Sequence, residues 1–267
     1  MTPDKPAMTF LGETRTWKQI DDRSHAFGAA LSRRGGVRFG DRVLMALLNR
    51  TEYVEAILGA TLIGAIPVPV NIRMSPAEVA YLMEDSGADV VVTETALTGV
   101  VDAARGLGGT SDTVIVVGES DKPDHLSFED LVAEDGSDLP LVDVPRGHCG
   151  DHHVHLGHHR PSQGRDAHPS ELPGAGPDLD LHDESAGRDV ASIVPPMFHI
   201  AGLATFAMVF YRGIRAVIHP LGSFDPDVML DTLEREARRR CSWCPHNGRP
   251  CAPHRRPSPP GICDCVT

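Results

Sequence analysis

Apolar residues near the amino terminus recur at the spacing of an α-helix. Ile20, Phe27 and Leu31 follow the period of about 3.6 residues that brings side chains to one helix face. The run Arg33-Arg34-Gly35-Gly36 then supplies basic residues for a last turn and a glycine stop. This pattern predicts a helix that ends near residue 34.

The apolar runs that follow alternate between the lengths of strands and of helices. Short runs bounded by turn residues predict buried strands, and longer runs predict helices. Pro67 and Pro69 favour an extended segment rather than a central strand at 67–70, because proline has no N–H for the ladder. The expected strands are 43–48, 90–92, 114–117, 191–194 and 214–218, and the expected helices are 53–63, 76–86, 202–210 and 226–236.

Strands that alternate with helices of this length indicate an α/β fold. Such chains form a parallel, doubly wound sheet with helices on both faces. The helix at 76–86 has the clearest start, with Ser75 as the N-cap and Pro76 at the first helical position. Because the alternation is interrupted, we expect the parallel sheet to be incomplete, with irregular segments at about 147–187 and 238–267.

Two stretches lack any apolar period. Residues 147–187 hold eight of the fourteen histidines, and the stretch from about 238 holds five of the six cysteines together with several prolines and arginines. A segment of this composition cannot bury a core of its own. We therefore expect four parts: an α/β part at 1–146, an aberrant His-rich segment at 147–187, a second α/β part at 188–237, and an aberrant tail at 238–267.

Charge and composition narrow the classes of partner. The formal net charge is −12, so no clustered positive field is expected for a nucleic acid or an anionic membrane. No apolar stretch approaches the roughly 20 residues that cross a bilayer, and residues 1–9 do not read as a signal peptide. We expect a soluble cytoplasmic protein that handles small molecules, with reduced cysteines.

Several short motifs stand in an order typical of one enzyme superfamily. They are Gly40-Asp41-Arg42-Val43, Asn49-Arg50-Thr51-Glu52, the segment 64–73, Glu78, Pro195-Pro196-Met197-Phe198-His199-Ile200-Ala201-Gly202 and Phe224-Asp225-Pro226. Together these motifs make the chain resemble the amino-terminal portion of an AMP-forming acyl-CoA synthetase, of the fatty-acid–CoA ligase type within the adenylate-forming superfamily.

The resemblance implies a reaction in two steps. A carboxylic acid attacks the α-phosphorus of ATP to give acyl-AMP and pyrophosphate, and the thiol of CoA then displaces AMP. In the intact family this chemistry needs Mg²⁺, a phosphate clamp and a lysine from a mobile carboxy-terminal domain. Family members are about twice as long as this chain, so the resemblance implies a truncated ligase.

The family's phosphate loop, Tyr-Thr-Ser-Gly-Thr-Thr-Gly-x-Pro-Lys-Gly, holds phosphate oxygens on backbone N–H groups and hydroxyls. At the corresponding place this chain has the different stretch from Val154 to Gly164. Codons compatible with that stretch, read from their second nucleotide, spell Tyr-Thr-Ser-Gly-Thr-Thr-Gly-Arg-Pro-Lys-Gly. The next residues, 165–169, then yield Ala-Met-Leu-Thr-His. The hypothesis is a frameshift across the phosphate loop, with no cofactor-binding residue left in frame.

The cysteine-rich tail behaves similarly in the other shifted frame. The stretch from Cys241 to Cys251 can be read as Val-Leu-Val-Val-Pro-Ala-Gln-Trp-Gln-Ala-Leu, a buried strand followed by a helix. The hypothesis extends the frameshift to residues 238–267. With the clamp scrambled, we expect the chain to be inactive by itself, with no catalytic residue and no productively bound cofactor.

The remaining candidates concern a metal site and an acyl site. Clustered histidines (148, 152, 153, 155, 158 and 159) and the Cys241-Ser242-Trp243-Cys244 motif leave open a non-catalytic metal-binding or regulatory protein. The resemblance implies instead that Phe198, His199 and Gly202 border the acyl pocket. The alternative for Phe198 and His199 is a loop at a strand end that packs on the core. Asp41, Arg42, Asn71 and Arg73 are expected in turns and helix caps.

Overall fold

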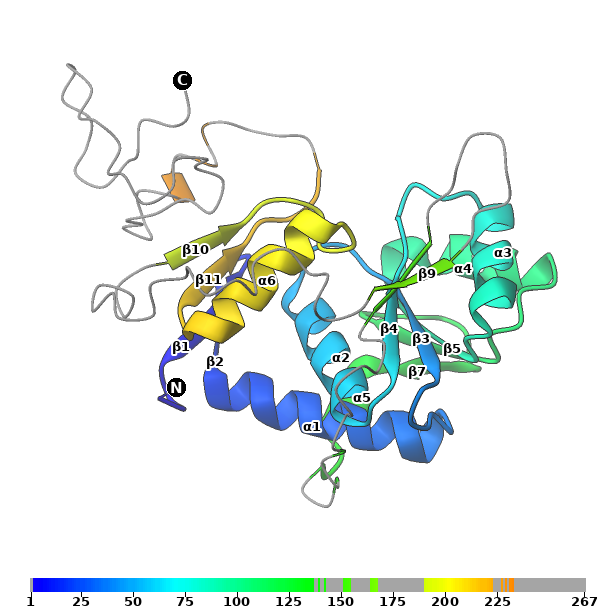
Figure 1. Ribbon diagram of the computed structural model, residues 1–267, viewed down its shortest axis with the longest axis horizontal. Coiled ribbons are helices and arrows are strands. Elements are labelled where there is room, and N and C mark those ends of the chain that lie inside the picture. The colour runs from blue at the N-terminus through cyan, green and yellow to red at the C-terminus, as the bar shows by residue number, and fades with distance from the viewer. Residues whose placement is uncertain are drawn as a thin grey trace. The chain divides into compact units, whose positions relative to one another are not determined.

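The chain forms two compact units in the computed structural model (Figure 1). One unit comprises Met1–Trp17 with Gly176–Thr267, and the other comprises Lys18–Ala175. The structure describes residues 2–136, 151–154, 164–167 and 190–222, together with residues 139, 142, 227, 229, 231 and 232.

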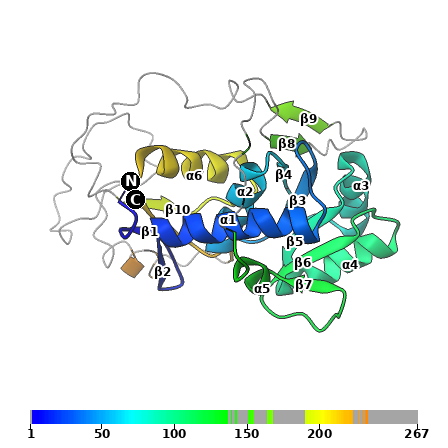
Figure 2. The same ribbon diagram turned by 90° about the horizontal axis from the view of Figure 1, so that it is seen from below.

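A parallel sheet of five strands forms the centre of the unit Lys18–Ala175. Its spatial order is β4-β3-β5-β6-β7, with all neighbours parallel. Figure 2 shows β5, β6 and β7 side by side. The strands are β3 (Arg42–Ala46), β4 (Ile66–Pro69), β5 (Val90–Glu94), β6 (Thr113–Val117) and β7 (His125–Ser127).

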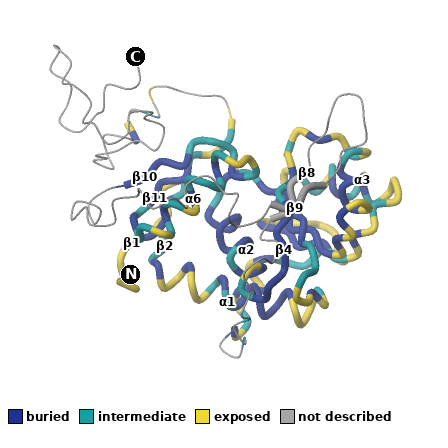
Figure 3. The backbone as a smooth tube through the Cα atoms, viewed as in Figure 1, coloured by how far each residue is buried: buried dark blue, intermediate teal, exposed yellow. Residues whose placement is uncertain are grey.

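Helices cover both faces of this sheet because two successive connections, from β3 to β4 and from β4 to β5, run in opposite directions along the sheet. Right-handed crossovers toward β4 and then back toward β5 bring their helices to opposite faces. Side chains of α3 and α4, including Leu82, Met83 and Val101, belong to one buried cluster with Leu44 and Val91 of the strands. Figure 3 shows the tube of α2 mostly in the colour of buried residues. The helices are α1 (Trp17–Arg34), α2 (Thr51–Leu62), α3 (Pro76–Ser86), α4 (Thr98–Gly106) and α5 (Phe128–Val132), and a 3₁₀ turn, η1, spans Thr95–Leu97.

Close backbone approach joins α1 to α2. A Cβ added to Gly28 would lie 2.7 Å from the carbonyl oxygen of Gly59, and one added to Gly59 would lie 2.8 Å from the carbonyl oxygen of Ser24. Beside this contact the rings of Phe27 and Phe128 lie 4.7 Å apart, and both are fully buried. The two glycines therefore let α1, α2 and α5 share one dense apolar core.

A buried ion pair reinforces the same contact. Arg23 of α1 donates from Nε to both carboxylate oxygens of Glu55 at 3.0 Å, and its terminal nitrogens bind Glu129 of α5. The Glu55 side chain has no exposed surface. Burial by itself would lower the pKa of Arg23, but the hydrogen bonds and charges of Glu129 and Glu55 outweigh it and raise that pKa. Arg23 thus stays charged and connects three helices.

The start of α3 confirms the cap predicted from its sequence. The Ser75 hydroxyl accepts from the backbone N–H of Glu78 at 3.4 Å, and the Ser75 backbone N–H donates to the Glu78 carboxylate at 2.7 Å. That backbone donor, with the Ser75 hydroxyl, lowers the pKa of Glu78. Gly87 ends the helix in the left-handed conformation, with φ of 60°.

A second sheet forms the unit that contains the amino terminus. Its order is β10-β11-β1-β2, where β1 is parallel to β11 and antiparallel to β2. Helix α6 (Ile200–Arg212) contacts β10, and the Phe210 ring meets the Trp17 ring edge-on with a centroid distance of 5.1 Å. The strands are β1 (Pro6–Phe10), β2 (Glu13–Thr16), β10 (Val190–Ile193) and β11 (Arg215–Ile218).

The α/β class and the parallel strands expected from the sequence are confirmed. The segment at 67–70 forms the edge strand β4, as its prolines require. The structure adds a division that the sequence did not predict, because β10 and β11 pair with β1 rather than extending the first sheet. The predicted helix at 226–236 and the cysteine-rich tail lie almost wholly outside the described residues.

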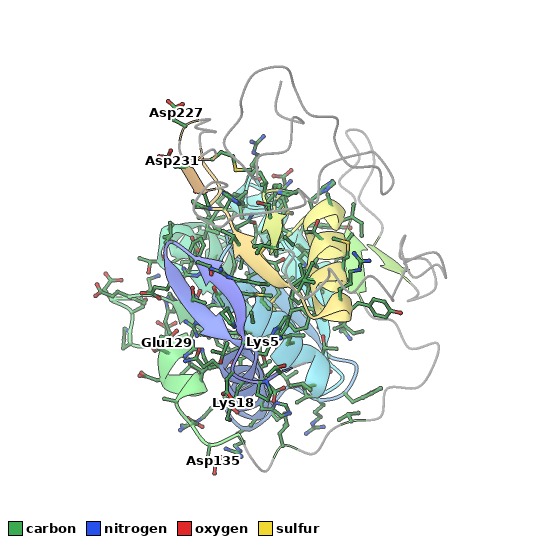
Figure 4. All side chains as sticks on the ribbon, turned by 90° about the vertical axis from the view of Figure 1, so that its left-hand side faces the viewer. Lys5, Lys18, Glu129, Asp135, Asp227 and Asp231 are labelled. Atoms are coloured by element: carbon green, nitrogen blue, oxygen red, sulfur yellow. The ribbon has the colours of Figure 1, made fainter. Side chains whose placement is uncertain are left out.

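Removal of the Arg23 guanidinium should destabilise the fold, because the buried Glu55 carboxylate loses its positively charged partner. We expect Arg23→Ala to lower the free energy of unfolding in urea by about 3 kcal/mol, because it leaves a carboxylate buried without its cation. The control is Lys18→Ala on the same helix. Lys18 binds Asp22 with both side chains more than half exposed, so its loss should cost at most about 0.5 kcal/mol. Figure 4 labels Lys18 and Glu129. Equal losses in the two variants would contradict this account.

Candidate functional site

The segment 195–202 lies after the carboxyl end of β10, where ligands bind in open α/β sheets. It winds tightly into α6. The N–H of His199 donates to the carbonyl of Pro196 at 3.0 Å, and the N–H groups of Gly202 and Leu203 donate to the carbonyl of His199 at 2.9 and 3.1 Å. These bonds fix the path of the backbone between the strand and the helix.

His199 caps the amino terminus of α6. Its Nδ1 accepts from the backbone N–H of Ala201 at 3.3 Å, so the neutral ring carries its proton on Nε2. The residue is exposed, and the preceding Phe198 is half-buried. The structure therefore gives His199 a capping contact and leaves Nε2 directed away from that contact. The sequence led us to expect a segment that borders an acyl pocket, with a loop at a strand end as the alternative, and it did not predict the cap.

Gly202 is buried where the segment crosses itself. A Cβ at this position would lie 2.3 Å from the carbonyl oxygen of Pro196 and 2.7 Å from Cα of Met197. Both partners are backbone atoms, which cannot move aside as a flexible side chain can. Glycine is thus required by packing, and Met197, with 1% of its surface exposed, fills the space below the loop.

A serine and a histidine meet at the same end of this sheet. Ser192 Oγ of β10 lies 3.1 Å from Nε2 of His219, which follows β11. The N–H of His219 also donates to the carbonyl of Ile193 at 2.9 Å. Sequence reasoning did not single out this pair. The only local signal was a polar residue in a strand that is otherwise apolar.

The stretch expected to replace the phosphate loop is bounded by two antiparallel strands. β8 (Asp151–Val154) pairs with β9 (Gly164–Ala167), and Val154 stands opposite Gly164. β8 contacts the edge strand β4. The connecting residues 155–163 lie outside the described residues. Their sequence has one glycine before the final Gly164 and contains no threonine or lysine, so the donor set does not fit the phosphates of ATP.

An ion-pair network occupies the carboxyl ends of β3 and β5. These neighbouring strands lead to helices on opposite faces, which is where doubly wound sheets open a crevice. Arg50 donates to Glu94 at 3.1 Å and to Glu52 at 2.9 Å, and Glu94 is buried. Burial would lower the pKa of Arg50, but bonds to Glu52 and Glu94 raise it. The network holds the strand ends together through its charges.

The polar residues expected in turns are found there. Asp41 accepts from the N–H of Arg38 at 2.8 Å, and Asn71 accepts from the N–H of Arg73 at 3.0 Å. Arg42 donates to the carbonyl of Ser86, the last residue of α3, at 2.6 Å. These contacts confirm the turn and capping roles.

The described residues do not gather a metal-ligand set. No group of three or more His, Cys, Asp or Glu side chains converges among them. The expected histidine and cysteine clusters lie outside those residues, apart from the backbone of β8. Across the described helices, none has the length and apolar composition that a bilayer crossing needs.

Relatives of the chain are acid ligases. A 4-coumarate–CoA ligase of rice is 31% identical over 84% of this chain and 41% of its own length. A fatty acid–[acyl-carrier-protein] ligase of Streptomyces coeruleorubidus is 30% identical over 80% of this chain and 40% of its own. A long-chain-fatty-acid–CoA ligase of Escherichia coli is 37% identical over 33% of this chain. The chain spans about two fifths of the length of the first two.

Solved structures share the fold. An anthranilate CoA ligase in complex with anthranoyl-AMP superposes with a TM-score of 0.78 at 21% identity, over 90% of this chain and 46% of its own. The amino-terminal domain of FACL13 from Mycobacterium tuberculosis gives 0.77 at 23% identity, over 90% and 58%. The AMP-binding enzyme family matches residues 1–171, more than half of the chain. The chain therefore belongs to the AMP-binding enzyme family.

Proposed function

We propose that this chain derives from an AMP-forming acid–thiol ligase that activates a carboxylic acid, in particular a fatty acid, to acyl-AMP and then to acyl-CoA. The observation that most directly supports this proposal is the family match over residues 1–171. Relatives whose names give aromatic and fatty acids as substrates support it further. The cytoplasm is the location expected for an enzyme that consumes ATP and CoA.

Three residues of this chain contribute to the acyl side of that proposed site. Phe198 offers an aromatic surface, His199 offers Nε2 beyond its capping contact, and Gly202 lets the backbone of the loop approach α6. Their role is to bind and shape. Among the described contacts, none of the three residues has a partner for proton transfer to a substrate, so no acid–base step is assigned to them.

ATP with Mg²⁺ supplies the phosphoanhydride chemistry in an intact ligase, but the residues at 155–163 do not fit the phosphates. We propose that residues 147–187 and 238–267 are translated out of frame, and that the α/β parts at 1–146 and 188–237 belong to one large domain. What supports this proposal is that codons compatible with residues 154–164, read from their second nucleotide, spell the phosphate loop of the family in full. The chain itself then catalyses no adenylation.

Restoring the frame should restore the phosphate site. We expect this chain to show no fatty-acid-dependent exchange of pyrophosphate into ATP at any acyl length. A variant in which residues 154–164 carry the shifted-frame sequence should gain ATP binding, measured by equilibrium dialysis, because it regains the lysine and the threonines. Exchange well above background by the unaltered chain would contradict the proposed inactivity. Failure of a folded, restored variant to bind ATP would contradict the frameshift.

The capping role of His199 can be separated from its proposed binding role. We expect His199→Ala to lower the free energy of unfolding by about 1 kcal/mol through loss of the cap, whereas His199→Asn should retain most of it, because asparagine is a preferred N-cap. Urea denaturation measures both. A His199→Asn variant as unstable as His199→Ala would show that the imidazole does more than cap the helix.

The acyl-site proposal can be tested without activity. A fatty acid that carries a photoreactive diazirine should label the segment 195–202, because Phe198 and the first turn of α6 would contact the chain of the bound acid. Peptide mass spectrometry locates the label, and excess unlabelled fatty acid should suppress it. Labelling confined to other elements, or insensitive to competitor, would contradict the proposal.

A further inference from the structure

A serine, a histidine and an aspartate line up between α4 and the loop that precedes β7. Ser120 Oγ lies 2.8 Å from Nδ1 of His125, and Nε2 of His125 lies 3.1 Å from the Asp102 carboxylate. Ser120 is exposed, whereas only 1% of the His125 side chain and 16% of the Asp102 side chain are exposed. An accessible hydroxyl is therefore connected to a buried imidazole and a largely buried carboxylate.

Hydrogen-bond chemistry fixes the direction of the two contacts. An ionised carboxylate only accepts, so His125 must donate from Nε2 to Asp102. In the neutral ring Nδ1 is then an acceptor, and the only proton it can receive is that of the Ser120 hydroxyl. This is the relation of a nucleophile to its general base, with the base oriented by a third group.

Neighbouring residues fix both Asp102 and Ser120, the two outer members of this hydrogen-bonded series. Lys122 Nζ binds Asp102 at 2.6 Å, and Arg105 lies 3.9 Å from the same carboxylate while binding Asp124 at 3.1 Å. The backbone N–H of His125 donates to the carbonyl of Lys122 at 3.2 Å, which closes the turn. The N–H of Lys122 donates to Ser120 Oγ at 3.3 Å. Lys122 thus binds the carboxylate at one end, and the turn holds the serine against the imidazole at the other.

We propose that Ser120 is a nucleophile activated by His125 as general base, with Asp102 as a positioning residue, and that its substrates are small, uncharged, activated acyl esters. Carboxylates outnumber cations here, with Asp102, Glu119, Asp121 and Asp124 beside Arg105 and Lys122, which disfavours anionic substrates. The described contacts supply no pair of N–H donors for an oxyanion, so a good leaving group is needed.

The acylation of Ser120 and the release of the acyl group need only these three side chains, the ester and water. Ser120 Oγ attacks the carbonyl carbon as its proton passes to Nδ1 of His125, and the imidazolium is stabilised by Asp102. The bond to the leaving group then breaks, the leaving oxygen takes the bonding electron pair and the proton held on Nδ1 of His125, and it departs as an alcohol or phenol while an acyl-serine remains. Water hydrolyses that ester by the same proton route. This site lies on other residues than those of the proposed ligase, so its test is independent of that function.

Acylation by 4-nitrophenyl acetate tests the proposal on the intact chain. We expect a fast release of 4-nitrophenol that approaches one equivalent per chain, with the acetyl group on the peptide that contains Ser120, followed by slower release as water hydrolyses the acetyl-serine. Ser75 is an internal control, because its exposed hydroxyl donates to the Glu78 carboxylate at 2.8 Å and has no imidazole partner. Ser120 should react about 100-fold faster than Ser75, the usual scale of general-base assistance.

Substitutions can distinguish a Ser120 hydroxyl that is activated by His125 from one that is merely exposed to solvent. Ser120→Ala should abolish the fast phase, and His125→Gly should slow it about 100-fold, with partial rescue by added imidazole. Asp102→Asn should slow it and lower the pH of half-maximal acylation, because the imidazolium loses its anionic partner while Lys122, Arg105 and Asp124 remain. Equal acylation of Ser75 and Ser120 in the unaltered chain would overturn the proposal whether or not the variants fold. Acylation of Ser120 unaffected by folded His125→Gly would overturn it too.

Discussion

Parallel pairing between β1 and β11 is the constraint on which the rest of the structure depends. It places Met8, Thr9 and Phe10 opposite Ala216, Val217 and Ile218. Arg215 also donates to the Thr9 hydroxyl at 2.8 Å, across 206 positions of sequence. Both strands carry runs of buried residues, and a slip of one residue in the pairing would turn every side chain to the other face of the sheet. The pairing therefore makes the amino-terminal strand and the segment after residue 188 parts of one sheet.

Local patterns predicted most of the unit Lys18–Ala175. The period of apolar residues in α1, the cap of α3 at Ser75 and the valine run of β5 each specify an element from short-range information. The elements that escaped prediction include β1, β2, β7, α4 and α5. β2 consists of polar residues and pairs with the neighbouring β1, which in turn pairs with β11, a strand distant in the chain. Tertiary pairing, rather than propensity, determines β1 and β2.

The site was predicted less completely than the fold, and the reasons are geometric. The motif around Phe198 drew attention to the loop between β10 and α6, but the cap that His199 makes depends on where α6 begins. The need for glycine at 202 depends on how the backbone of Pro196 crosses above it. Arg50 was part of a recognised motif, yet its partner Glu94 lies 44 positions later. Contacts of this range have no signature in residue spacing.

The proposed frameshift, flanked by blocks that keep the family motifs, would account for a chain that has the family fold but not the family phosphate-loop sequence. The central claim concerns the codons for Val154 to Gly164, which the nucleotide sequence of the locus reads directly. The account predicts that the frame beginning at the second nucleotide of these codons spells Tyr-Thr-Ser-Gly-Thr-Thr-Gly-Arg-Pro-Lys-Gly. Codons that give no glycine-rich, threonine- and lysine-containing loop in that frame would contradict it.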